Sequence, residues 1–207
     1  DFFTKGNKKL SKNVYVINTS SALECPSLQL GLCNAYIDDK CICYAIKSEV
    51  QYGGKDGSCF KFHDYQGIYY DNHSAEEITD KLLASSKRST KYPMVFLRYN
   101  TFGDFVNQEQ VDKMNEIAKI LGEYGIITYG YTARKDLDFS NRCRWFIVNG
   151  SGFMIDNNFD ITWDEDEVDC LSNKKVIGHK EDQHYCGKEC VKCMYSTHKT
   201  IHEMGRL

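Results

Sequence analysis

The chain has 207 residues, and its 26 Lys and Arg residues nearly balance 29 Asp and Glu residues, which gives a formal net charge of −3. This balance does not indicate a nucleic acid or a membrane surface as a partner. A hydrophobic content of 42% is sufficient for one well-buried core and excludes a mainly disordered chain. No apolar run reaches the roughly 18 residues of a membrane span, and the polar opening lacks the apolar segment of a secretory signal, so we expect a cytoplasmic protein.

The first part of the chain alternates predicted strands with predicted helices. A short strand rich in β-branched and aromatic residues is expected within residues 13–21, and a short helix over 44–52. Ser74, with a glutamate three positions later, has the pattern of a capping box and predicts a helix over 75–87. The nearly continuous apolar run at 93–98 is typical of a strand that is buried on both faces.

The same alternation continues further along the chain, although residues 58–72 fit neither pattern clearly. A second capping pattern at Asn107 predicts a helix that ends near Gly122, and strands are expected at 126–131 and 144–148. Strands that alternate with helices indicate βαβ crossovers, so the expected fold class is α/β with a mainly parallel sheet.

Ten cysteines are present, and eight of them fall into two groups. Their share of the chain is below the roughly 8–10% that is typical of a small disulfide scaffold. Thiol-rich groups in a chain without a secretory signal favour metal binding, with disulfides as the alternative. The N-terminal thiol group comprises Cys25, Cys33, Cys41 and Cys43, and the C-terminal thiol group comprises Cys170, Cys186, Cys190 and Cys193.

The C-terminal thiol group contains a C-x₃-C-x₂-C motif, and three thiolates from one tight loop can hold three corners of an iron–sulfur cluster. Cys170 is the expected fourth ligand. Zinc fits the same residues, with His179 or His184 as a nitrogen ligand. The spacing does not separate iron from zinc, nor one shared metal site from two.

The acidic stretch within residues 160–169 predicts a solvated loop that leads into the cysteine-rich tail. We therefore expect an α/β domain over residues 1–160 and a metal-binding tail over residues 161–207, packed on the same domain. Near the end of the tail, His198 and His202 are four residues apart, which favours one face of an exposed helix and is also compatible with zinc binding.

Polar residues follow the predicted strands, where parallel α/β folds place their functional groups. We predict Arg98, Asp104 and Arg134 as catalytic residues, and Thr132, Asn149 and Ser151 as cofactor-binding residues. Four of them have a structural alternative: Asp104 as a helix cap, Arg134 in a surface ion pair with Asp136 or Asp138, and Asn149 and Ser151 as turn residues. No Walker A motif, dinucleotide-binding glycine motif or nucleophile elbow is present.

The order of these motifs resembles a largely uncharacterised family of cysteine-rich bacteriophage proteins that are similar to reduced radical S-adenosylmethionine (SAM) barrels. The resemblance is carried by Cys25-Pro-Ser-Leu, Gly31-Leu-Cys33, Cys41-Ile-Cys43-Tyr-Ala45, Leu97-Arg98, Gly103-Asp104-Phe105, Tyr131-Thr-Ala-Arg134 and the terminal Cys186/Cys190/Cys193 motif. It implies a partial parallel (βα) barrel, a [4Fe–4S] cluster and bound SAM. The chain departs from the radical-SAM pattern in that its C-x₃-C-x₂-C motif lies at the C-terminus and Lys192 precedes the last cysteine.

Together these features predict an iron–sulfur-binding phage protein, with SAM-dependent radical chemistry on an unknown small-molecule or macromolecular substrate. The host-cell cytoplasm is its expected location. The alternative from a different functional class is a non-catalytic binding module that zinc stabilises and that engages a host or phage macromolecule.

Overall fold

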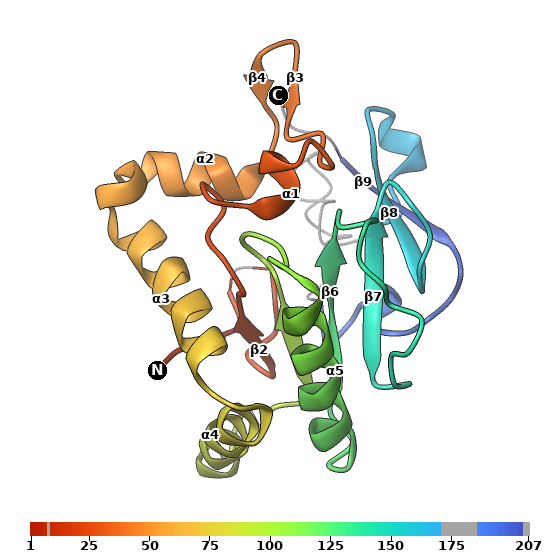
Figure 1. The fold of residues 1–207 in the computed structure, drawn as a ribbon. Coiled ribbons are helices and arrows are strands. Elements are labelled where there is room, and N and C mark those ends of the chain that lie inside the picture. Colours follow the sequence, from red (N-terminus) through yellow and green to blue (C-terminus); the bar gives the residue numbers. More distant parts are fainter. Residues whose placement is uncertain (8, 171–185, 205–207) are drawn as a thin grey trace.

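The structure, a computed structural model, describes residues 1–7, 9–170 and 186–204 (Figure 1). Seven strands form one sheet in the order β1-β2-β5-β6-β7-β8-β9. All neighbours pair in parallel except β1 and β2, which are antiparallel. The strands are β1 (Thr4–Lys5), β2 (Val14–Ile17), β5 (Phe96–Tyr99), β6 (Ile127–Thr132), β7 (Phe146–Ser151), β8 (Asn157–Thr162) and β9 (Thr200–Met204). The expected α/β class with a mainly parallel sheet is therefore confirmed.

The helices come mainly from the long connection between β2 and β5 and from the connection between β5 and β6. They are α1 (Pro26–Gln29), α2 (Tyr44–Gln51), α3 (Ser58–Asn72), α4 (Ala75–Arg88) and α5 (Gln108–Gly122). A short hairpin, β3 (Tyr36–Ile37) with β4 (Lys40–Cys41), lies between α1 and α2. Helices α4 and α5 pack against each other (Figure 1). In the same view, β2 is the labelled strand nearest to α3, and β6, β7 and β8 follow at increasing distance from that helix. None of the helices in the described ranges combines the length and the apolar character that a bilayer crossing requires.

The sheet is buried on both faces, because alternate residues of its strands enter two different cores. On one face, Leu97 and Tyr99 of β5 pack with apolar residues of α4 and α5. On the other face, Phe96 and Tyr129 pack with Met194, which belongs to the short helix η4 (Lys192–Met194). The cysteine-rich C-terminal segment thus covers the face of the sheet that α4 and α5 leave open.

The elements predicted over 44–52, 75–87 and from Asn107 are present as α2, α4 and α5. Both N-caps act as expected: the Ser74 side chain closes a complete capping box on α4, and Asn107 accepts a hydrogen bond from the backbone N–H of Gln110 on α5. Asp104 is therefore not the cap of α5.

The C-terminal residues depart from the expectation of a helix at His198 and His202, which was wrong. Residues Thr200–Met204 form strand β9, which pairs in parallel with β8 and so completes an edge of the sheet. In β9 the backbone N–H and C=O groups form hydrogen bonds with β8, whereas in a helix they would form hydrogen bonds within the segment itself. The predicted boundary between residues 160 and 161 lies within β8, and β9 adds the end of the tail to the same sheet.

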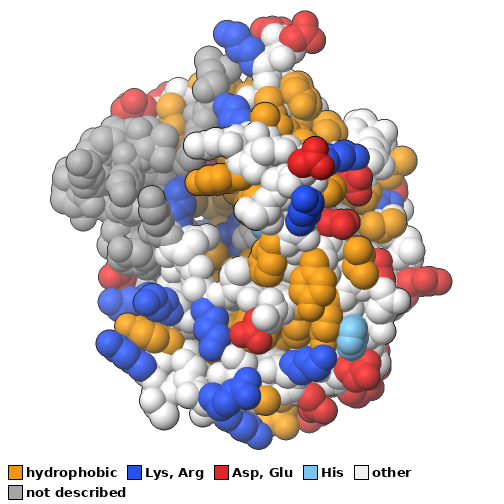
Figure 2. Space-filling view, turned by 90° about the vertical axis from the view of Figure 1, so that its left-hand side faces the viewer, with side chains coloured by type: hydrophobic (Ala, Val, Ile, Leu, Met, Phe, Trp, Pro, Cys, Tyr) orange, Lys and Arg blue, Asp and Glu red, His pale blue; other side chains and the backbone are white. Residues whose placement is uncertain are grey.

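Charge on the face shown in Figure 2 has no single dominant sign. On the face that carries α2 to α4, basic side chains gather at the lower left and acidic ones at the lower right, with apolar side chains between them (Figure 2). This distribution agrees with the net charge of −3.

Candidate functional site

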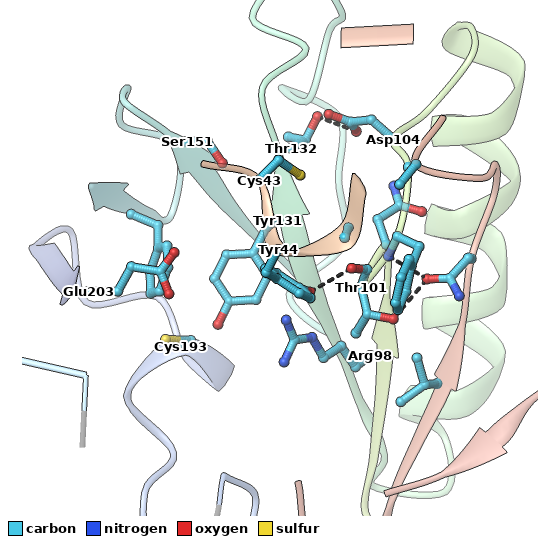
Figure 3. A pocket seen from close by; sticks show the side chains of 18 of the residues that line it. Cys43, Tyr44, Arg98, Thr101, Asp104, Tyr131, Thr132, Ser151, Cys193 and Glu203 are labelled. Atoms are coloured by element: carbon cyan, nitrogen blue, oxygen red, sulfur yellow. Dashed lines mark hydrogen bonds between the residues drawn. The ribbon is translucent and has the colours of Figure 1, made fainter. Parts of the chain in front are cut away.

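A cavity of about 590 Å³ extends from the carboxyl ends of β2, β5 and β6 over the sheet face that the C-terminal segment covers (Figure 3). Its wall brings together residues from the two ends of the chain. Seven of the eight predicted metal-ligating cysteines line it: Cys25, Cys33, Cys43, Cys170, Cys186, Cys190 and Cys193. Four other predicted site residues also line it: Arg98, Asp104, Thr132 and Ser151. Cys41, Arg134 and Asn149 lie outside the lining.

The N-terminal thiol group lies on the segment from α1 to the start of α2. Burial raises the pKa of Cys25 to about 12, and the nearby Asp104 adds to this effect. Burial also raises the pKa of Cys33 to about 11, with a further contribution from Cys43. These thiols are therefore protonated at neutral pH, and they lie close enough to influence each other's ionisation.

Backbone hydrogen bonds join the C-terminal thiol group to residues 9–11, which lead into β2. The Cys186 N–H donates to the Lys9 carbonyl at 3.0 Å, and the Cys186 carbonyl accepts from the Ser11 N–H at 2.9 Å. Gly187 adopts a φ of +84°, and a Cβ there would lie 2.3 Å from Val14, so a side chain does not fit. These contacts place the C-x₃-C-x₂-C loop directly beneath β2.

Cys193 lies at the centre of the C-terminal thiol group. Burial raises the pKa of Cys193 to about 12, and the nearby thiols of Cys170, Cys186 and Cys190 contribute to this increase. A hydrogen bond with Tyr131 has the opposite, smaller effect. The four predicted ligands of this group therefore share one neighbourhood.

No disulfide joins any of the ten cysteines, all of which belong to the described residues. Within the same residues, no three Cys, His, Asp or Glu side chains form a ready-made metal site. The donor chemistry nevertheless fits a thiophilic metal, because neighbouring thiols that lose their protons are soft ligands for zinc or iron–sulfur clusters. Binding would require the thiols to turn toward a common centre. His179 and His184, the expected alternative ligands, lie outside the described residues.

Asp104 is buried, with 4% of its surface exposed, and accepts four hydrogen bonds. Two come from the hydroxyls of Ser27 (2.6 Å) and Thr132 (2.7 Å), and two from the backbone N–H groups of Ala133 and Phe105, both at 2.8 Å. Burial raises the pKa of Asp104, and this effect is larger than that of the hydrogen bonds, which lower the pKa. Because its acceptor sites are occupied, the carboxylate joins α1, the end of β5 and the end of β6 rather than offering a free oxygen to the cavity.

Gly103 makes this junction possible. Its φ is +66°, and a Cβ would lie 2.2 Å from the Ser20 hydroxyl oxygen. The Ser20 hydroxyl in turn donates to the Asp104 carbonyl at 2.8 Å. The loop after β5 can therefore approach the loop after β2 only with glycine at this position.

Arg98 points into the cavity from β5 (Figure 3). The carbon at the centre of its guanidinium lies 4.8 Å from the centre of the Tyr131 ring, within the range of a cation–π contact. Burial lowers the pKa of Arg98, but the ionisable side chains nearby, three tyrosines and Cys186, outweigh burial, and the pKa lies above the ordinary arginine value. Its Nε is buried without a hydrogen-bond partner in the described part of the chain.

The remaining predicted residues have mainly architectural contacts. Arg134 forms a bidentate ion pair with Asp136 at 2.8 Å and donates to the carbonyls of Phe105 and Val106. Asn149, fully buried, donates to the Cys193 carbonyl at 3.0 Å and so ties the C-terminal thiol group to β7. Ser151 is exposed at the end of β7, on the rim of the cavity.

Sequence reasoning missed the pair formed by Glu49 and His63. The His63 Nδ1 lies 2.8 Å from Glu49 Oε1, and His63 lines the cavity with its ring stacked on Phe102. Glu49 also accepts from the backbone N–H groups of Ala22 and Leu23. Burial alone would raise the pKa of Glu49, but these hydrogen bonds lower it. The two residues are fourteen positions apart in different helices, so no local pattern indicates their contact.

The chain matches no protein-family model, no curated protein and no solved structure at a significant level. The resemblance to cysteine-rich bacteriophage proteins rests on the motifs alone and stays a prediction.

Proposed function

We propose that this protein binds an iron–sulfur cluster through cysteines of the C-terminal thiol group, on the wall of a cavity that receives a small substrate. The observation that carries the proposal is the shared cavity: thiols from residues 25–43 and from residues 170–193 line the same space. The two groups lie more than a hundred positions apart in the sequence, so it is the fold that brings them to one cavity.

Cys170, Cys186, Cys190 and Cys193 are the residues that would hold the cluster. They supply the four thiolates that a cuboidal cluster takes, and the backbone hydrogen bonds of Cys186, with the hydrogen bond that the Asn149 side chain donates to the Cys193 carbonyl, hold their loop in place. When bound, such a cluster supplies one-electron transfer next to the cavity. The N-terminal thiol group, on the opposite part of the wall, is the candidate for a second metal.

The finer hypothesis is a radical-SAM-like partial barrel. It is supported by the six parallel strands, which follow one another across the sheet in chain order as in a barrel opened along one seam. The helices α4 and α5 cover one face, as the outer helices of such a barrel do. A SAM-cleavage assay on reduced, iron-loaded protein tests this hypothesis separately from cluster binding.

Anaerobic purification, with iron, sulfide and zinc measured per chain and a visible spectrum recorded, tests the proposal. We expect brown protein with iron and sulfide in nearly equal amounts, because a cuboidal cluster contains both in equal number. The Cys59→Ser variant is the matched control, since Cys59 lies outside the cavity wall, and it should retain the metal. Colourless protein with stoichiometric zinc would overturn the iron proposal and favour the zinc-stabilised binding module.

A further inference from the structure

We propose that the cavity binds an organic carboxylate, with Arg98 as the group that receives its negative charge. The juxtaposition that carries this inference is an arginine that forms no ion pair with the described residues, inside a cavity of ligand size. The inference does not rest on metal binding, because Arg98 and the cavity wall are present in the metal-free chain, although Cys186, a proposed cluster ligand, lies close enough to influence the charge of Arg98.

The charge of Arg98 is not neutralised by its protein surroundings. No acidic side chain in the described ranges forms an ion pair with it, and its Nε lacks a hydrogen-bond acceptor. Burial raises the pKa of its aromatic neighbours Tyr129 and Tyr131 above the ordinary phenol value, so both phenols are neutral at pH 7. A cation removed from water without a partner is costly, so an anion that enters the cavity gains a strong interaction.

The other basic residues show how differently Arg98 is placed. Arg134 pairs with Asp136, and Arg142 pairs with Asp156 at 2.7 Å. Lys192, also on the cavity wall, lies 3.8 Å from Asp169. Within the described part of the chain, Arg98 is thus an arginine on the cavity wall without an ion pair, and it is the cation that we expect to bind a ligand.

The shape and lining of the cavity define the rest of the ligand. Its volume of about 590 Å³ is within the range of small-molecule sites. Apolar and aromatic side chains form much of its wall, among them Ile42, Ile46, Phe62, Phe102 and Phe159. A guanidinium binds a carboxylate through two parallel hydrogen bonds, and one cation matches one negative charge, so a monocarboxylate with an apolar body fits better than a phosphate ester.

The probe is 4-fluorobenzoate, with the uncharged 4-fluorobenzamide as its isosteric control, and binding to the full chain as purified is measured by fluorine NMR titration. We expect the acid to bind at least about tenfold more tightly than the amide, as charge-assisted hydrogen bonds to Arg98 require. Arg98→Gln should abolish this difference. Arg144→Gln is the matched control, because Arg144 is an exposed arginine that stacks on Trp145, and it should leave the difference unchanged.

Equal binding of acid and amide to the natural chain would overturn the inference, as would an unchanged preference in Arg98→Gln. Stronger displacement of the probe by inorganic phosphate than by acetate would overturn the carboxylate class. If Arg98→Gln does not fold, Arg98→Lys replaces it in the test. This variant keeps the charge but loses the paired hydrogen bonds, so its preference for the acid should be weaker than that of the natural chain. Iron is measured in the same samples, so that this result can be separated from the metal proposal. If Arg98→Gln loses iron and the natural chain shows no preference for the acid, Arg98 supports the metal site and does not bind a carboxylate.

Discussion

Two buried carboxylates fix the segment that carries Cys25. Asp104 accepts from the Ser27 hydroxyl in α1, and Glu49 accepts from the backbone of Ala22 and Leu23. Cys25 lies between these two anchoring points. Neither carboxylate offers a free oxygen to a ligand, so both act by positioning the N-terminal thiol group.

Replacing Asp104 with alanine should destabilise the protein strongly. Four donors that now bond to the carboxylate would lose their acceptor in a buried site, and we expect the free energy of unfolding to fall by about 3 kcal/mol or more. Urea denaturation followed by circular dichroism measures the effect. Asp80→Ala, an exposed change on α4, is the control and should be nearly neutral. Matching denaturation midpoints for the two variants would show that the Asp104 contacts contribute little.

At the level of elements, the connection between β7 and β8 is unusually short for parallel strands. Asp156 stabilises it by accepting from the Val148 N–H at 2.9 Å and from both Nε and a terminal nitrogen of Arg142. Burial opposes ionisation of this carboxyl, but the bonds to Arg142 and Val148 outweigh it and lower the pKa of Asp156.

The lowered pKa of Asp156 predicts the sign of a pH effect. The folded state binds this proton less readily than the unfolded state, so the stabilisation is present above the ordinary aspartate pKa of about 3.9 and is lost as the pH falls. Asp156→Asn should therefore lower the free energy of unfolding by about 2–3 kcal/mol at pH 7 and by less near pH 3. Thermal unfolding at the two pH values measures the difference, and a pH-independent loss would contradict the ion-pair explanation.

Local patterns predicted those elements whose sequence shows one clear periodicity or cap. Ser74 and Asn107 indicate the starts of α4 and α5 correctly, and the apolar run before Arg98 corresponds to β5. Helix α3 was not predicted, because tyrosines and polar residues alternate irregularly along it and its buried side includes His63 and Gln66. Strand β9 was mistaken for a helix because its pairing with β8 involves a distant partner, which no local pattern contains.

At the scale of the whole molecule, the cavity is enclosed because the N-terminal thiol segment lies at the carboxyl ends of the strands while the C-terminal thiol group covers the adjoining face of the sheet. The rule that polar groups gather at the carboxyl ends of parallel strands correctly anticipated Arg98, Asp104 and Thr132 as neighbours of this edge. The rule does not distinguish a residue that faces a ligand from one that supports the loops, and Arg134 is of the second kind. The C-terminal thiol group covers the open face of the sheet because Met194 packs against the strands. The spacing of residues in the sequence gives no information on this contact.

The central claim is that the C-terminal thiol group holds a metal cluster on the cavity wall, and iron per chain in matched cysteine variants tests it most directly. Cys193→Ser removes the thiol at the centre of this group, whereas Cys143→Ser removes a half-buried thiol that packs against the other core. Both variants and the natural chain would be purified anaerobically and compared at equal protein concentration. We predict that Cys193→Ser loses most of its iron and sulfide while Cys143→Ser retains them; equal iron in the two variants would contradict the claim.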